Sequence, residues 1–177
     1  MVKPIVLAVG AIPVIVALLI VYPLIIKPDI PFSAANPNDT IEIEYTKHQL
    51  KKISFGVTER VGAEKTEILL IKNNGEVKYS VTMEGYPQPD VKSQLSEEKL
   101  RRLTALIKET GFIEIPSESF PINDDVFDYK KSNVKITLNG KSKIVHWPEQ
   151  NATEKFIPPI ISMVESQLDQ IIKQISE

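Results

Sequence analysis

The pattern of hydrophobic and polar positions sets residues 4–26 apart from the rest of the chain. These residues include no charged side chain, and the hydroxyl of Tyr22 is their one polar side-chain group. A helix of this length spans roughly 30–35 Å at about 1.5 Å per residue, enough to cross a bilayer core. The pattern therefore predicts a transmembrane anchor over residues 1–27. A cleaved signal peptide is the alternative, because Ser33-Ala34-Ala35 supplies small residues beyond the apolar run.

Residues 28–40 are rich in proline, which predicts a stiff, extended stalk. Beyond it, residues 41–177 have the length and composition of one folded domain. We expect this domain outside the cytoplasm of a single-pass cell-membrane protein, because a short N-terminus commonly stays inside. The chain also has two glycosylation sequons, at Asn38 and Asn151, and such sequons matter only outside the cytosol.

Within the domain, several runs alternate with the two-residue period of a β-strand. Residues 41–45 and 53–57 form the first two such runs, and Gly56 is interpreted as a bulge in the second. Residues 67–72 and 76–83 predict a hairpin around Asn73-Asn74-Gly75, closed by a type I′ turn or a three-residue loop. Residues 134–138 and 141–147 predict a second hairpin around Asn139-Gly140.

Two further segments repeat their apolar residues at helical spacing. The first helix is expected to begin after the N-cap Ser96 and to end at Gly111, which suits a left-handed backbone position. The second follows Pro158-Pro159 and runs close to the C-terminus. The predicted fold is therefore α+β: an N-terminal transmembrane helix, then an antiparallel sheet of two hairpins packed on two helices.

Charge and composition argue against several classes of function but do not identify one. Beyond the anchor the chain has 19 Lys and Arg against 23 Asp and Glu, which argues against nucleic acid as a partner. There is no cysteine, and the two histidines, His48 and His146, show no metal-ligand spacing. His48 lies in a polar stretch and is expected to be exposed. We predict no catalytic residue, no metal and no cofactor, and therefore no enzyme.

An acidic segment within residues 117–131 is the main candidate for ion or partner binding. Asp124, Asp125 and Asp128 lie close together there, and oxygen ligands at such density suit calcium. The segment has no EF-hand pattern, however. The alternative is a solvated acidic turn that Phe127 and Tyr129 attach to the core.

From residue 95 onward the order of features resembles the emfourin-like family. The resemblance rests on LSEEKLRRLTALIKETGFIEIP, on DVFDYKKSNVKITLNGKSKIVHW and on the closing helix. It implies a small protein inhibitor of thermolysin-type metalloproteases. The family shows a Ser-Gly-Gly stretch near its first strand, where this chain reads Ser54-Phe55-Gly56, so the inhibitory loop is not carried over. The chain also resembles uncharacterised single-pass archaeal surface proteins with the same order of anchor and domain.

These observations predict a membrane-tethered, extracytoplasmic protein-binding module without enzymatic activity. Its expected contact surfaces are residues 56–65, the segment 83–90 with its aromatic Tyr86, and the acidic residues Asp124, Asp125 and Asp128. The alternative is an accessory structural subunit that the anchor holds in a membrane complex, in which Gly10 and Pro13 would form a packing notch. A hydrolase would need His48 or His146 beside a serine or carboxylate in a cleft.

Overall fold

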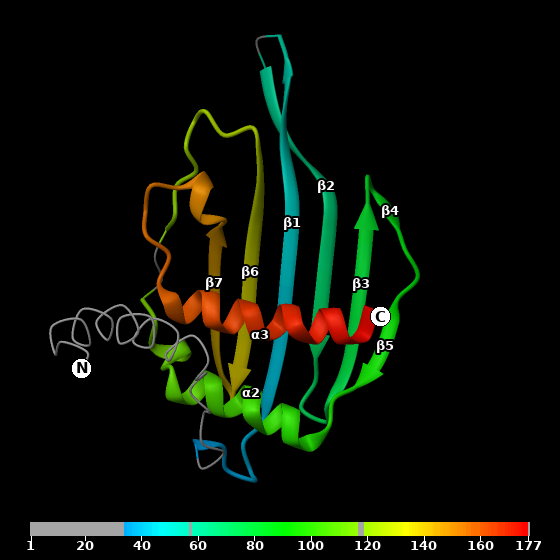
Figure 1. The fold of residues 1–177 in the computed structure, drawn as a ribbon, viewed down its shortest axis with the longest axis vertical. Coiled ribbons are helices and arrows are strands. Elements are labelled where there is room, and N and C mark those ends of the chain that lie inside the picture. Colours follow the sequence, from blue (N-terminus) through cyan, green and yellow to red (C-terminus); the bar gives the residue numbers. More distant parts are fainter. Residues whose placement is uncertain (1–33, 57, 117–118, 177) are drawn as a thin grey trace, which may run out of the picture. The chain divides into compact units, whose positions relative to one another are not determined.

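The computed structural model describes residues 34–56, 58–116 and 119–176. These residues form an antiparallel sheet of seven strands with helices across one of its faces (Figure 1), which confirms the α+β class. The elements in chain order are β1 (Ile41–Phe55), β2 (Thr58–Ile71), β3 (Glu76–Met83), β4 (Tyr86–Pro87), β5 (Val91–Gln94), α2 (Glu97–Glu109), η2 (Phe112–Glu114), β6 (Asp128–Leu138), β7 (Lys141–Pro148), η3 (Gln150–Ala152) and α3 (Pro159–Ser176).

Strand β1 lies in the middle of the sheet and joins the two predicted hairpins. The strand order is β4-β3-β2-β1-β6-β7, and the short β5 also pairs with β3. The β2–β3 register sets Leu69 opposite Tyr79 and Ile71 opposite Val77. The second hairpin, β6–β7, is confirmed as well, although its strands extend beyond the predicted bounds.

The two hairpin turns differ in their backbone conformations. In the first hairpin, Lys72 N donates to the carbonyl of Glu76, and Gly75 has a φ of 81°. Of the two predicted alternatives, this hairpin therefore has the three-residue loop and not the type I′ turn. In the second hairpin both Asn139 and Gly140 have positive φ, as a type I′ turn requires.

The first strand is longer than the sequence pattern indicated. Residues 41–45 and 53–57 were predicted as separate runs, but β1 continues unbroken from Ile41 to Phe55. The expected bulge at Gly56 is wrong: Gly56 lies in the turn after β1, with a φ of 73°. The register instead shifts between Gln49 and Leu50, which pair with Lys65 and Ala63 and leave Glu64 as the extra residue.

Helix α2 begins and ends as predicted. The Ser96 side chain accepts a hydrogen bond from Lys99 N, and Gly111 adopts the left-handed conformation at φ 64° and ψ 31°. Phe112 follows it and is fully buried. Helix α2 therefore has a fixed start, a fixed stop and one apolar face, which it packs against the sheet.

The core lies between the sheet and the two helices, on the face that Figure 1 shows toward the viewer. One row of side chains runs across four strands, because Leu69, Tyr45, Val134 and Val145 are register partners in turn. Helix α3 covers this row with Val164, Leu168 and other buried residues. Beyond α3, the strands continue without a helix over them (Figure 1).

Residues 34–40, the described part of the predicted stalk, contact the domain. Ala35 is buried, and the carboxylate of Asp39 accepts a bond of 2.8 Å from Lys108 Nζ on α2. Asn139 Nδ2 also donates to Asp39, at 2.8 Å. The predicted anchor at residues 4–26 lies outside the described residues. Among the helices that are described, none has the length and apolar character needed to span a membrane.

Candidate functional site

The three segments predicted as contact surfaces lie at the same end of the sheet. Strand β1 ends there at Phe55 and β2 begins there at Thr58, while β3 ends at Met83 and β6 begins at Asp128. Antiparallel pairing brings these four strand ends together, although they are far apart in sequence. We call this region the open end; it consists of the β1–β2 hairpin (residues 51–62) and two flanks (residues 83–90 and 123–128).

The β1–β2 hairpin extends beyond its neighbours at the open end (Figure 1). Pairing between β1 and β6 ends at Lys51 and Asp128, and pairing between β2 and β3 ends at Lys65 and Met83. Past these positions, among the described residues, the two strands pair with each other, and one backbone hydrogen bond joins each of them to a flank. Two aliphatic side chains are exposed on this ribbon, Ile53 (44%) and Val61 (54%).

One flank is a tight turn between β3 and β4. Glu84 and Gly85 both have positive φ, and Met83 pairs with Tyr86 across them. Glu84 N donates to the carbonyl of Glu64 at 2.7 Å, which attaches the turn to the extra residue of β2. The Tyr86 side chain is 73% exposed, so this predicted contact residue is available to a partner.

The other flank is the acidic segment before β6, which is bonded to β1. Lys52 N donates to the carbonyl of Phe127 at 2.6 Å, and the Lys52 ammonium lies 5.3 Å from the Phe127 ring centroid. The Asp128 carboxylate accepts a bond from Gln49, while Asp124 and Asp125 are exposed. The structure thus brings all three predicted aspartates to the open end, across the strands from Tyr86.

The acidic flank has the features of a solvated turn. Its three aspartates do not converge, and no group of three or more His, Asp or Glu within the described ranges is placed to hold a metal ion. Tyr129 is buried, as expected for a residue that attaches the turn to the domain. Phe127, expected to do the same, is 55% exposed and lies beside Lys52 instead.

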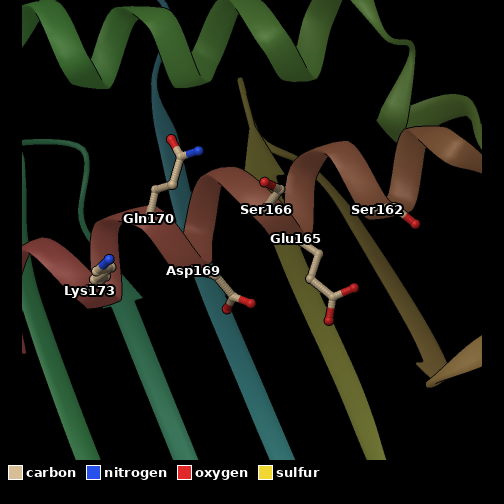
Figure 2. A pocket seen from close by; sticks show the side chains of 6 residues that line it. All are labelled: Ser162, Glu165, Ser166, Asp169, Gln170 and Lys173. Carbon is tan, nitrogen blue, oxygen red and sulfur yellow. The ribbon is translucent and has the colours of Figure 1, made fainter. Parts of the chain in front are cut away.

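Between the open end and the core lies a polar row that the sequence did not indicate. Glu67, Lys47, Ser132 and Trp147 are register partners on adjacent strands, one step beyond the buried row. Helix α3 meets this row with two carboxylates, those of Glu165 and Asp169. In Figure 2 both point away from the side of α3 on which Gln170 lies.

Glu165 accepts hydrogen bonds from three strands. Ser132 Oγ lies 2.9 Å from Glu165 Oε1, and Trp147 Nε1 lies 3.1 Å from Oε2. The Tyr45 hydroxyl is within reach of Glu165 (3.3 Å) and of Asp169 (3.1 Å), and Lys47 Nζ donates to Asp169 at 2.9 Å. Burial and the two negative charges raise the pKa of Tyr45. These bonds fix α3 to the sheet and occupy the oxygens of Glu165, so its role is structural.

The hollows beside α3 are polar and shallow. One, of about 300 Å³, is lined by three members of the polar row, by Glu165 and Asp169 of α3, and by residues such as Lys130 and Glu149; the three members are Lys47, Ser132 and Trp147. Another, drawn in Figure 2, is lined by six residues of α3 alone and is therefore the outer surface of that helix. Neither brings together a nucleophile and a histidine.

The two histidines differ in their surroundings. His48 lines a third hollow, of about 600 Å³, together with Glu64, Glu67 and Glu84, whereas His146 lines none of the three. His146 is exposed and its neighbour Trp147 is buried, so the two point to opposite faces of β7 as predicted. His48 is half-buried rather than exposed, and its Nδ1 lies 3.0 Å from Thr66 Oγ1. Burial and the nearby positive charge of Lys131 lower the pKa of His48. No described serine or carboxylate is hydrogen-bonded to either ring.

Both sequon asparagines are exposed. Asn38 lies in a turn closed by Asp39 N and the carbonyl of Asn36, at 3.1 Å. Asn151 lies in η3, and the hydroxyl of Thr153 in the same sequon accepts a bond from Lys155 N. Each asparagine is therefore accessible on the folded surface.

Comparison with protein-family models finds no match for the chain, and comparison with curated proteins finds none either.

Proposed function

We propose that the protein is a membrane-tethered, extracytoplasmic protein-binding module without enzymatic activity, and that it binds its partner at the open end. One observation carries this proposal. Among the described residues, five of the eight exposed large hydrophobic side chains lie at the open end: Ile53, Val61, Met83, Tyr86 and Phe127. Exposed apolar residues gathered in one region are typical of protein interaction sites, and aromatic residues are frequent anchors there.

The direction of the chain supports the same proposal. Residues 34–40 lie at the end of the sheet where β1 begins, whereas the open end lies where β1 finishes. A chain anchored through residues 4–26 would therefore hold the domain by one end and leave the open end free. The tether itself is inferred from the sequence.

A photo-crosslinking experiment on the full chain in native membranes tests this proposal. p-Benzoylphenylalanine would replace Tyr86 or Phe127 at the open end, and Lys72 or Lys141 at the opposite end as controls. We expect one protein adduct of the same mass from both open-end positions and none from the controls. Adducts from the control positions alone would reject the open end as the binding surface.

Inhibition of a metalloprotease is a specific form of this proposal. Residues 54–56, which correspond to the Ser-Gly-Gly stretch of the emfourin-like family, lie at the tip of the protruding hairpin. The full-length protein in detergent micelles would be titrated against a thermolysin-type protease. If activity is unchanged at micromolar concentrations, this form of the proposal fails while the more general one remains.

The second candidate function is that of an accessory structural subunit, docked through the anchor. Exchange of residues 1–27 for an unrelated transmembrane helix separates the two functions. A binding module keeps its adducts at Tyr86 and Phe127 after the exchange. An anchor-docked subunit loses its complex instead.

A further inference from the structure

The hairpin and its flanks carry opposite charges. Residues 51–60 include three cationic side chains, Lys51, Lys52 and Arg60, against the single acidic residue Glu59. The flanks include five acidic residues and no cationic one: Glu84, Asp90, Asp124, Asp125 and Asp128. Lys51 forms an ion pair with Glu64 of β2, at 3.1 Å, which offsets one of these positive charges. Within the described structure, the open end is therefore a weakly basic hairpin between two acidic flanks.

The hairpin also presents an apolar side chain on each of its faces. Ile53 pairs with Arg60, and Val61 pairs with Lys52. Cross-strand partners share a face and consecutive residues alternate, so Ile53 and Val61 lie on opposite faces. Both are exposed, because no described element packs over this part of the ribbon. A flat partner surface would cover only one of them.

We infer that the partner receives the hairpin in a cleft that is acidic inside and basic at its rim. This inference rests on the proposed function and adds the shape and charge of the partner. The ribbon extends past the β6 ladder by about four residues, or roughly 13 Å, enough to enter such a cleft. Lys51, Lys52 and Arg60 then meet the acidic interior, and the exposed Glu84, Asp124 and Asp125 meet the rim.

The acidic flanks distinguish this partner from a lipid surface. An apolar hairpin with lysines could insert into an anionic bilayer, where each cation near the surface is favourable. Insertion would, however, bring the carboxylates of Glu84, Asp124 and Asp125 to within about a Debye length, roughly 10 Å, of the same headgroups. The repulsion opposes insertion, and a protein cleft with a basic rim removes it.

Crosslinking from the two faces of the hairpin tests the inference. p-Benzoylphenylalanine would replace Ile53 or Val61 in the full chain, in native membranes. We expect the same adduct from both positions, since a cleft encloses both faces. The yield of this adduct should fall by roughly tenfold or more in the variant Lys51→Glu/Lys52→Glu/Arg60→Glu, and by a similar factor in the variant Asp124→Lys/Asp125→Lys. The control Lys135→Glu/Lys141→Glu, at exposed positions of β6 and β7, should leave it unchanged.

Failure of this inference can be told apart from failure of the proposed function. The cleft inference fails if only one hairpin face gives an adduct, or if the charge reversal on the hairpin does not lower the adduct yield. In either case, adducts from Tyr86 and Phe127 would still show that a partner binds at the open end. Loss of adducts from all four positions overturns the proposed function itself. Unchanged Trp147 fluorescence in each variant would verify that the domain is folded.

A vesicle experiment provides the lipid arm of the test. The chain has no cysteine, so an environment-sensitive dye can be attached to a single Ile53→Cys in the full-length protein. We expect no blue shift on adding vesicles of phosphatidylcholine and phosphatidylglycerol. A blue shift that depends on phosphatidylglycerol would overturn the inference in favour of a bilayer.

Discussion

Trp147 donates its indole Nε1 hydrogen to Glu165 Oε2 at 3.1 Å, and this bond joins β7 to α3. Ser132 of β6 and Tyr45 of β1 reach the other oxygen of the same carboxylate. A single glutamate thus links one helix to three neighbouring strands, at the boundary between the apolar core and the uncovered part of the sheet.

Replacement of Glu165 by leucine should destabilise the domain by roughly 2–3 kcal/mol, because it leaves partly buried donors without an acceptor. Urea unfolding measures the loss. Trp147 is the single tryptophan, so its emission should shift in the folded variant. Tyr45→Phe is the matched control, since Glu165 keeps Ser132 and Trp147; it should cost less and leave the emission unchanged. Equal losses of unfolding free energy in the two variants would contradict the role of Glu165 as the shared acceptor of the three strands.

Replacement of Gly75 by alanine should destabilise the domain by about 2 kcal/mol or more. Gly75 has a φ of 81°, and a Cβ there would lie 2.8 Å from the Leu95 carbonyl oxygen. Gly140→Ala is the control, because Gly140 has a φ of 80° with open space around the added atom. It should cost about 1 kcal/mol, from the backbone conformation alone. Similar thermal midpoints for the two variants would show that the close approach to Leu95 is unimportant.

Asp39 should make the stability of the domain depend on pH in the acidic range. Burial raises the pKa of Asp39, but hydrogen bonds from Lys108, Asn139 and the Asn36 backbone outweigh it and hold the pKa below the ordinary value of 3.8. A lowered folded-state pKa contributes stability above pH 3.8 that is lost as the pH falls through the folded value.

The test compares the unfolding free energies of the wild type and Asp39→Asn from neutral pH downward. The variant should be less stable at neutral pH, and the difference should shrink as the pH falls below 3.8. Lys108→Met supplies a double-mutant cycle for the ion pair. A difference that stays constant down to the lowest pH would rule out Asp39 as the titrating group.

Substitutions at the open end should leave stability almost unchanged. Tyr86→Ala and Val61→Ser remove exposed side chains, so each should change the free energy of unfolding by no more than about 0.5 kcal/mol. Tyr45→Ala, at a position that is 1% exposed, should cost about 3–5 kcal/mol. Losses above about 1 kcal/mol from the open-end variants would mean that these side chains support the fold rather than a partner.

Local chemistry made part of the fold predictable. Ser96 and Gly111 set the limits of α2, and Asn139-Gly140 sets the second hairpin, because each acts locally. Ser96 acts through its side-chain bond to Lys99 N, and the other three through their left-handed backbone conformations. Hydrophobic alternation failed along residues 47–52 for a physical reason. This part of β1 buries neither face in an apolar core, so five of its six side chains are polar, and Leu50 alone shows no period of two.

The candidate site was predictable only in pieces. Tyr86 and the aspartates were recognisable as exposed loop residues, but their meeting at one end of the sheet depends on the strand order, which the sequence pattern left open. The turn at Glu84-Gly85 was missed because it lacks the usual asparagine. Glu165 was not recognisable as a structural residue, because nothing in its own segment reveals the three donors on distant strands.

The central place of β1 has a mechanical consequence. The strand begins beside residues 34–40 and ends in the hairpin about 50 Å away, at roughly 3.3 Å for each of its 15 residues. A pull between an anchor and a captured partner would therefore run along β1 itself. Its hydrogen bonds to β2 and β6 lie perpendicular to that force and would be loaded together in shear, rather than broken one after another. The strand that carries the hairpin is thus also the one best placed to bear tension.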